Sequence, residues 1–459
     1  MVAKKLIVLC DGTWCGPETG TESNIHRLAW MMGIDPTAKT VTHDFGNVQV
    51  GYFKGVGLSG SFMSYLWDAA FASNREKDCN EVYDYIVQNF TKEHEIWMFG
   101  LSRGAYTVRS VAGMINNCGI VQETTSPVIK QIYKLYRSPY AVNEPNSPEM
   151  QRFREQVSYD VQTPVKFMGL FDTVGSLGIP RLNYDTGVGF EWPEFHDNKV
   201  SSVVEKVYHA ISIHDRFWAF QPCLASRDDT HTNTKRPDLR IYQKWFPGAH
   251  YDIGRQEFQF LREGSNAVER FINRWGHTVS PNEPLSDLVL LWMPEGIKAE
   301  GGRAIITRDM AGNPSDIDTI IGDMRADITG LRTGDGDIYD DIPKYFPLGK
   351  LSFIPKIFVW AANKILPLSS SLATANKTFF GTTHRVIPDP GDPDNPDRAF
   401  VKNEVYDYTT GDRDLNDSVI RDTALCTRYK SKTFENYTHY MTATGRNLDG
   451  SRIVALEPA

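Results

Sequence analysis

The strongest chemical signal in the chain is a serine between two glycines, Gly100-Leu-Ser102-Arg-Gly104. An apolar run at 96–99 comes directly before it, and apolar residues at helical spacing follow it, namely Val108, Val111, Ala112 and Ile115. This order predicts that Ser102 lies on a sharp turn between a strand and a helix. Larger side chains at Gly100 and Gly104 would clash across such a turn, so both glycines are needed there. A serine held in this way can be the nucleophile that attacks an ester.

An acid and a base must accompany this serine, because its hydroxyl is a weak nucleophile until its proton is removed. Asp172 closes the apolar run 165–171, which places its carboxylate at the end of a predicted strand, where ligands bind in parallel sheets. His250 stands in a glycine-punctuated loop after another predicted strand at 239–245. The order serine, acid, histidine is that of α/β-hydrolases. We therefore predict that Asp172 is the acid and His250 the base.

Other residues compete for both roles. His214 is the alternative base, and Asp215 and Asp252 are alternative acids. Asp172 also has a purely structural alternative, as a helix cap or a turn former. From the sequence alone these alternatives stay open.

A second turn, Asp11-Gly12-Thr13, follows the apolar run 6–10. We expect it to line the site, with backbone N–H groups near Gly12 and Arg103 forming the oxyanion hole. The helix that begins at Arg103 also aims its first N–H groups at this point. Aspartate-nucleophile phosphatases carry the same letters after their first strand, but their nucleophile stands two residues earlier, at the position of Leu9. A leucine cannot be phosphorylated, which argues against that class.

Strands joined by crossover helices must position these residues. Short apolar runs at 6–10, 96–99, 165–171 and 239–245 alternate with helix-period segments over the first two-thirds of the chain. One helical face is marked by Val82, Ile86 and Phe90. A further helix is expected from the spacing of five apolar residues, Val200, Val203, Val204, Val207 and Ile211. The pattern predicts an α/β-hydrolase-like, doubly wound, mostly parallel sheet.

The rhythm changes after about residue 296 to turns rich in Asp and Gly. We therefore expect an α/β-hydrolase catalytic domain at 1–296 and a C-terminal cap or elaboration at 297–459. Within the second part, 345–372 has the spacing of an amphipathic helix, with Ile354, Ile357 and Phe358 on one face. Such a helix either packs permanently on the core or forms a lid that covers an acyl pocket and meets lipid.

Composition limits the partners and cofactors. The net charge of -8 offers no basic field for nucleic acid. Six scattered cysteines without a Cys-x-x-Cys pair favour reduced thiols and disfavour a zinc site. Gly55-Val-Gly57-Leu-Ser-Gly60 matches a dinucleotide fingerprint but lacks a clear ribose-binding acid, so we expect neither a metal nor an organic cofactor. The apolar run 6–10 is too short for a signal peptide or a membrane span, which favours a cytoplasmic protein.

Several motifs in one order resemble a known family, the uncharacterised α/β-hydrolase domain family that includes the phospholipase effectors of the bacterial type VI secretion system. The resembling pieces are Cys10-Asp-Gly-Thr-Trp14, Ser23-Asn-Ile25, Gly55-Val-Gly57, Gly100-Leu-Ser-Arg-Gly-Ala105, Gly169-Leu-Phe-Asp-Thr-Val-Gly175, Trp245-Phe-Pro-Gly-Ala-His-Tyr-Asp-Ile-Gly254, Leu285-Ser-Asp-Leu288 and Leu291-Trp-Met293.

This resemblance implies that Ser102 is the nucleophile, Asp172 the triad acid and His250 the base. It also implies hydrolysis of a lipid or small ester, with peripheral membrane contact. The chain after Met293 departs from the family pattern, and caps select substrates, so the resemblance does not choose between phospholipid and small ester. A catalytically silent hydrolase-fold binding module is the alternative from another functional class.

Overall fold

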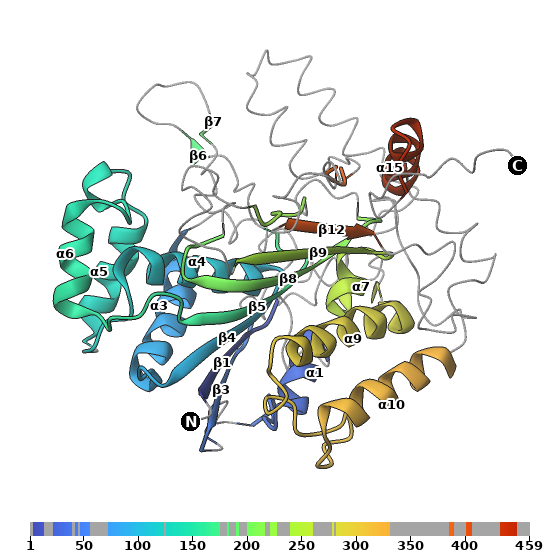
Figure 1. Ribbon diagram of the computed structural model, residues 1–459, viewed down its shortest axis with the longest axis horizontal. Coiled ribbons are helices and arrows are strands. Elements are labelled where there is room, and N and C mark those ends of the chain that lie inside the picture. The colour runs from blue at the N-terminus through green and yellow to red at the C-terminus, as the bar shows by residue number, and fades with distance from the viewer. Residues whose placement is uncertain are drawn as a thin grey trace, which may run out of the picture.

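The fold is seen in a computed structural model of the chain (Figure 1). The residues that the structure describes are 3–12, 22–38, 42–44, 46–55, 72–123, 125–174, 181–182, 190–191, 200–215, 221–226, 239–259, 278–279, 281–330, 385–389, 401–405 and 432–447.

Eight of the described strands form one sheet in the order β12-β9-β8-β5-β4-β1-β3-β2. Their bounds are β1 (Lys4–Cys10), β2 (Thr42–Asp44), β3 (Val48–Phe53), β4 (His94–Leu101), β5 (Val165–Phe171), β8 (Val204–Ser212), β9 (Arg240–Phe246) and β12 (Val401–Val405). Every neighbouring pair is parallel except β2 with β3. Two small antiparallel pairs lie outside this sheet, β6 (Arg181–Leu182) with β7 (Phe190–Glu191) and β10 (Phe258–Gln259) with β11 (Thr278–Val279). The predicted α/β fold with a mostly parallel sheet is confirmed.

Helices cover both faces of the sheet (Figure 1). One face packs against α3 (Ala72–Asn89), α4 (Arg103–Cys118) and α5 (Ser126–Tyr136), and the other against α1 (Asn24–Met31), α9 (Glu283–Ala299) and α10 (Ile317–Gly330). The remaining described helices are η2 (Ala141–Asn143), α6 (Pro148–Val157), α7 (His250–Gly254) and α15 (Lys432–Ala443). The two apolar cores on opposite faces explain why the central strands are apolar on both sides.

The predicted strands lie where the apolar runs indicated. The run 165–171 is β5 without change, whereas β4 extends the run 96–99 at both ends and β9 is shifted by one residue. The helical face of Val82, Ile86 and Phe90 belongs to α3 and the residue that follows its end. These predictions are confirmed.

The helix predicted at 200–211 is wrong, because most of this segment forms strand β8. β8 lies between β5 and β9 near the middle of the sheet, so both of its faces are buried. Val204 and Val207 face one apolar core, while Ala210 and Ile211 join the other. A strand buried on both faces loses the alternation that marks strands, and its valines then fall by chance at helical spacing.

The second part of the chain adds to the sheet. β12 pairs in parallel with β9, from Val401 beside Ile241 to Val405 beside Trp245. The boundary predicted after residue 296 falls inside α9, and the division into a catalytic domain at 1–296 and a cap at 297–459 stays a prediction. The helix predicted within 345–372 lies outside the described residues. Within the described part of the chain, no helix has the apolar length that crossing a bilayer requires.

Candidate active site

Ser102 stands on the turn between β4 and α4, in a backbone conformation that residues with a side chain rarely adopt. Its φ is 57° and its ψ is -115°. A Cβ atom on Gly100 would lie 2.5 Å from the Ala105 nitrogen, and one on Gly104 would lie 2.1 Å from the Cys10 carbonyl oxygen. The predicted strained turn, with its need for both glycines, is therefore present.

A chain of hydrogen bonds connects Ser102, His250 and Asp172. Ser102 Oγ lies 3.0 Å from His250 Nε2, and His250 Nδ1 lies 2.6 Å from Asp172 Oδ2. All three residues are at most 2% exposed. Because a carboxylate only accepts, the Nδ1 proton is donated to Asp172, which leaves Nε2 to accept the proton of the Ser102 hydroxyl. The structure thus brings the three predicted residues together in the order that proton transfer requires.

Asp172 is held at the carboxyl end of β5, with a φ of 39°. Its backbone N–H donates to Ala210 O at 2.7 Å, and its Oδ1 accepts the Ser212 N–H at 3.0 Å. Burial raises the pKa of this carboxyl group, but the Arg385 guanidinium and the bond from His250 outweigh burial and hold the pKa below its ordinary value. Asp172 is therefore a carboxylate facing the imidazole.

His250 is the first residue of α7, and the turn before it sets its direction. Gly248 has a φ of 108°, a region that favours glycine. The His250 N–H donates to Asp215 Oδ2 at 3.0 Å. Asp252 accepts the Ala249 N–H at 2.7 Å and so closes the start of the helix. These backbone bonds fix the imidazole over Ser102.

The competing residues hold the turn that carries His250. His214 Nδ1 accepts the Gly248 N–H at 2.9 Å. Asp215 binds the His250 backbone, and Asp252 bridges the Ala249 and Asn282 N–H groups. Burial raises the pKa of Asp252 to about 7, against the lowering effect of those two bonds. The imidazole that meets Ser102 is therefore that of His250, and the carboxylate that meets the imidazole is that of Asp172.

Asp11 lies buried at the carboxyl end of β1, where three donors from the described residues bind it. Ser23 Oγ donates to Oδ1 at 2.7 Å, Tyr52 OH to Oδ2 at 2.6 Å, and the Gly12 N–H to Oδ1 at 2.7 Å. Asp11 thereby ties the first turn to α1 and β3. The bond from Gly12 also means that its N–H, a predicted oxyanion donor, points at Asp11 in this structure. Thr13 lies outside the described residues.

Arg103 begins α4 and lines a cavity of about 310 Å³ beside the serine turn. Its described lining includes Asp11 and Arg103, both predicted to line the site, together with Lys54, Lys77 and Asp78. Ser102, Asp172 and His250 are not among the described residues that line it. The cavity therefore neighbours the serine turn and does not contain the serine.

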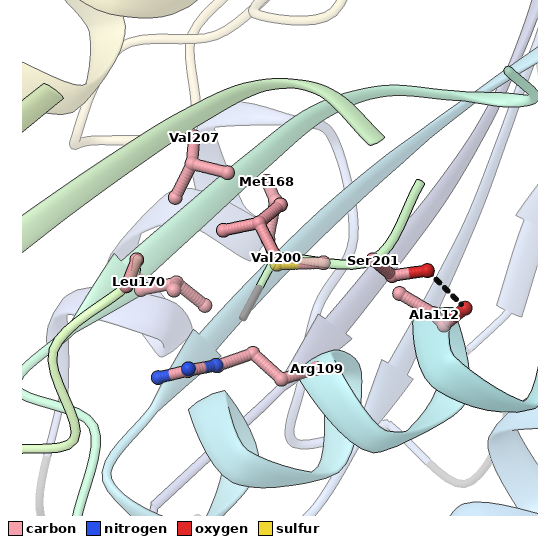
Figure 2. Close-up of a pocket in the computed structure, with 8 residues that line it drawn as sticks. Arg109, Ala112, Met168, Leu170, Val200, Ser201 and Val207 are labelled. Carbon is pink, nitrogen blue, oxygen red and sulfur yellow. Dashed lines mark hydrogen bonds between the residues drawn. The ribbon is translucent and has the colours of Figure 1, made fainter. Parts of the chain in front are cut away.

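A smaller cavity lies between α4 and the sheet, where Figure 2 shows Arg109, Met168 and Leu170 around it. Ser201 Oγ donates to Ala112 O at 3.0 Å on one side. Its volume of about 10 Å³ has room for one water molecule at most and excludes a substrate.

Arg385 was not predicted from the sequence; its side chain is 0% exposed and pairs with Asp172. Arg385 Nη1 donates to Asp172 Oδ1 at 2.6 Å, and Nη2 donates to Oδ2 at 2.9 Å. Nothing in its local sequence, Thr-His-Arg385-Val-Ile, distinguishes it from an exposed arginine. The described residues contain no cluster of three or more His, Cys, Asp or Glu side chains that could hold a metal ion.

The sequence matches a known family over most of its length. The model of the Tle1-like phospholipase effector catalytic domain of the type VI secretion system (T6SS) matches residues 4–296, more than half of the chain. The chain belongs to this family. The resemblance predicted from the motifs is thereby confirmed.

Among proteins similar to this Tle1-like chain is the uncharacterized protein YEL023C of Saccharomyces cerevisiae (strain ATCC 204508 / S288c). It is 29% identical over 230 residues, which make up 47% of this chain and 32% of the relative. The chain thus spans about a third of the relative's length.

Two solved structures align with the chain at low similarity. The Tle1 effector bound to the VgrG spike of the type VI secretion system is 16% identical, with 76% of this chain and 83% of that chain covered and a TM-score of 0.33. An uncharacterized protein from Pseudomonas aeruginosa is 15% identical, with 83% and 62% covered and a TM-score of 0.32.

Proposed function

We propose that this Tle1-like domain hydrolyses carboxylic esters of lipids or small alcohols through a covalent acyl-enzyme on Ser102. The observation that carries the proposal is the buried hydrogen-bond chain from Ser102 through His250 to Asp172, which starts at a strained turn. A serine in that setting can pass its proton to a base as its oxygen attacks.

In the first half of the reaction, Ser102 Oγ forms a bond to the ester carbonyl carbon while His250 Nε2 takes the hydroxyl proton. The carbonyl electron pair moves onto oxygen, which becomes an oxyanion. When that pair returns, the bond to the alcohol oxygen breaks, and the alcohol leaves with the proton from His250 Nε2.

In the second half, a water molecule repeats the attack on the acyl carbon, again losing its proton to His250. The acid leaves, and Ser102 Oγ recovers the proton. Asp172 keeps the Nδ1 proton in place throughout and stabilises the imidazolium that forms in each half. Neither half requires a cofactor.

The oxyanion needs preorganised N–H donors, and the start of α4 supplies one. The Arg103 N–H lies at the N-terminus of this helix, next to the nucleophile. The second donor belongs to the turn after β1. The Gly12 N–H donates to Asp11 in this structure, so it can serve only after that bond breaks. If the substrate is a lipid, the protein would contact the membrane surface peripherally, with the edge of the sheet that carries Ser102.

The test compares turnover of a soluble p-nitrophenyl ester and of phosphatidylethanolamine vesicles by the wild-type chain and by Ser102→Ala. An acyl-enzyme mechanism predicts a burst of p-nitrophenol followed by slower turnover, with both absent in the variant. A folded wild-type chain that shows neither burst nor turnover on either substrate would support the alternative of a catalytically silent hydrolase-fold binding module.

A further inference from the structure

Donors from Arg385, Ser212 and His250 surround the carboxylate of Asp172. Oδ1 accepts from Arg385 Nη1 at 2.6 Å and from the Ser212 N–H at 3.0 Å. Oδ2 accepts from Arg385 Nη2 at 2.9 Å and from His250 Nδ1 at 2.6 Å. A carboxylate has about four acceptor sites, so these bonds occupy the whole group and fix its rotation. Arg385 Nη1 also donates to Ser212 O at 2.9 Å, which anchors the guanidinium to the end of β8.

We infer that Arg385 is a positioning residue of the active site, which orients Asp172 and sets the pH at which the Asp172–His250 pair takes up a proton. The inference rests on the proposed function, because Arg385 would affect the reaction of Ser102 only through Asp172 and His250. Its physical basis is the fork geometry of the guanidinium, which matches both carboxylate oxygens and carries a permanent positive charge.

This arginine lies outside the stretch 4–296 that matches the family. The segment that carries it is held at its other end by Asp389, which accepts from Arg446 Nη1 at 2.7 Å and from Tyr440 OH at 2.6 Å. Tyr440 belongs to α15, and Arg446 lies three residues after the end of this helix. The second part of the chain therefore supplies a residue to the site and holds that residue's segment in place.

Other titratable groups interact with the Asp172–His250 pair: His209 of β8 interacts with Asp172, and Asp215 after β8 interacts with both residues. Arg109 of α4 interacts in turn with His209, and Asp252 of α7 with Asp215. Burial and the nearby Arg109 lower the pKa of His209 to about 3, so this ring is neutral at working pH and adds no positive charge. Asp215 adds negative charge when ionised. Arg385 is thus a cation in direct contact with Asp172, and its charge offsets the negative charge of Asp172 and of ionised Asp215.

Removing that charge leaves a buried carboxylate next to an imidazole without its counter-ion. The pair then binds a proton more readily, and a protonated pair cannot accept the serine proton. The acidic limb of the kcat/KM profile must therefore move to higher pH. A residue that only stabilises the fold would lower the melting temperature without moving this limb.

The experiment measures kcat, KM and the pH profile of kcat/KM with a soluble p-nitrophenyl ester for full-length wild type, Arg385→Gln and Arg385→Lys. In Arg385→Gln we expect a limb shifted upward by about 1 pH unit or more. We also expect a kcat lowered on the order of 100-fold, because Asp172 and His250 lose their fixed orientation. Arg385→Lys keeps the charge but loses the fork, so its limb should stay near the wild-type position while kcat falls about tenfold.

Arg27→Gln is the matched control, because Arg27 of α1 also forms a largely buried ion pair, with Asp287 of α9, and neither helix carries Ser102, His250 or Asp172. This control should lower the melting temperature and leave the limb unmoved. The inference would be overturned if folded Arg385→Gln keeps the acidic limb at its wild-type pH and loses no more kcat than Arg27→Gln does. If Arg385→Gln does not fold, Arg385→Lys decides, since an unchanged kcat in that variant contradicts the positioning role and a fall in kcat at constant KM supports it.

Ser102→Ala, assayed in parallel, separates this inference from the proposed function. Activity that survives in Ser102→Ala contradicts the proposed function itself. Activity lost in Ser102→Ala together with an unmoved limb in Arg385→Gln contradicts only the role of Arg385.

Discussion

The second glycine of the serine turn, Gly104, lies where α4 passes the end of β1. An added Cβ atom there would lie 2.1 Å from Cys10 O and 2.6 Å from Asp11 O. Carbon and carbonyl oxygen in favourable contact are about 3.3–3.6 Å apart, so Gly104→Ala must move the start of α4 by roughly 1 Å. Ser102 lies two residues before Gly104 and moves with it.

The size of the effect follows from this displacement. Overpacking of a close contact costs about 1–3 kcal/mol, and alanine returns up to about 1 kcal/mol through its higher helix propensity. We therefore expect Gly104→Ala to lower the free energy of unfolding by up to about 3 kcal/mol. A misplacement of roughly 1 Å in the nucleophile should lower kcat on the order of 100-fold.

The assay combines chemical denaturation with turnover of a soluble p-nitrophenyl ester. Gly322→Ala is the matched control, because Gly322 is exposed in α10 and an added Cβ there would meet nothing within 4 Å. The control should gain about 0.5–1 kcal/mol in stability and keep its kcat. If Gly104→Ala behaves like Gly322→Ala in both measurements, the close contact at Gly104 does not determine the position of Ser102.

The remaining predictions concern the histidines and aspartates around Ser102. His250→Ala should lower kcat by about 10⁴-fold or more, whereas His214→Ala should mainly cost stability, about 1–3 kcal/mol, because a buried loop N–H loses its acceptor; steady-state kinetics and denaturation of both variants check this ranking. Asp172→Asn should lower kcat on the order of 10⁴-fold through the wrong imidazole tautomer. Asp252→Asn should instead lower the melting temperature, because its amide NH₂ would face a backbone N–H; equal kinetic losses in the two asparagine variants would contradict these roles. The lowered pKa of Asp172 contributes stability that is fully present above the unfolded-state value of about 4 and is lost as pH falls below it, so Asp172→Asn should flatten acid denaturation in that range.

Local patterns were sufficient to predict the three residues that the structure brings together. The glycines around Ser102 leave a signature because they prevent backbone clashes, and Asp172 stands directly after an apolar strand that is easy to recognise. His250 was predicted from its glycine-rich loop, although the short helix α7 that it begins was not. Each of these signals lies within a few residues of the side chain concerned.

Features that depend on distant parts of the chain could not be predicted in this way. β8 was mistaken for a helix because its valines are buried on both faces, which only the arrangement of the whole sheet decides. Arg385 is separated from Asp172 by 213 residues, and an arginine that is buried with a carboxylate has the same letters around it as an exposed one. The bond from the Gly12 N–H to Asp11 is local, but it could not be predicted either, because it depends on how one side chain is oriented within its turn.

The most direct test of an activated Ser102 is labelling of the folded chain with a fluorophosphonate, followed by mass mapping of the modified peptide. The wild-type chain is expected to carry one adduct, located on Ser102, and Ser102→Ala to carry none. Labelling of His250→Ala should be greatly slowed, because the probe reacts only with a serine whose proton a base removes. A folded wild-type chain that stays unlabelled, or that carries the adduct on another serine, would contradict the assignment of Ser102 as the nucleophile.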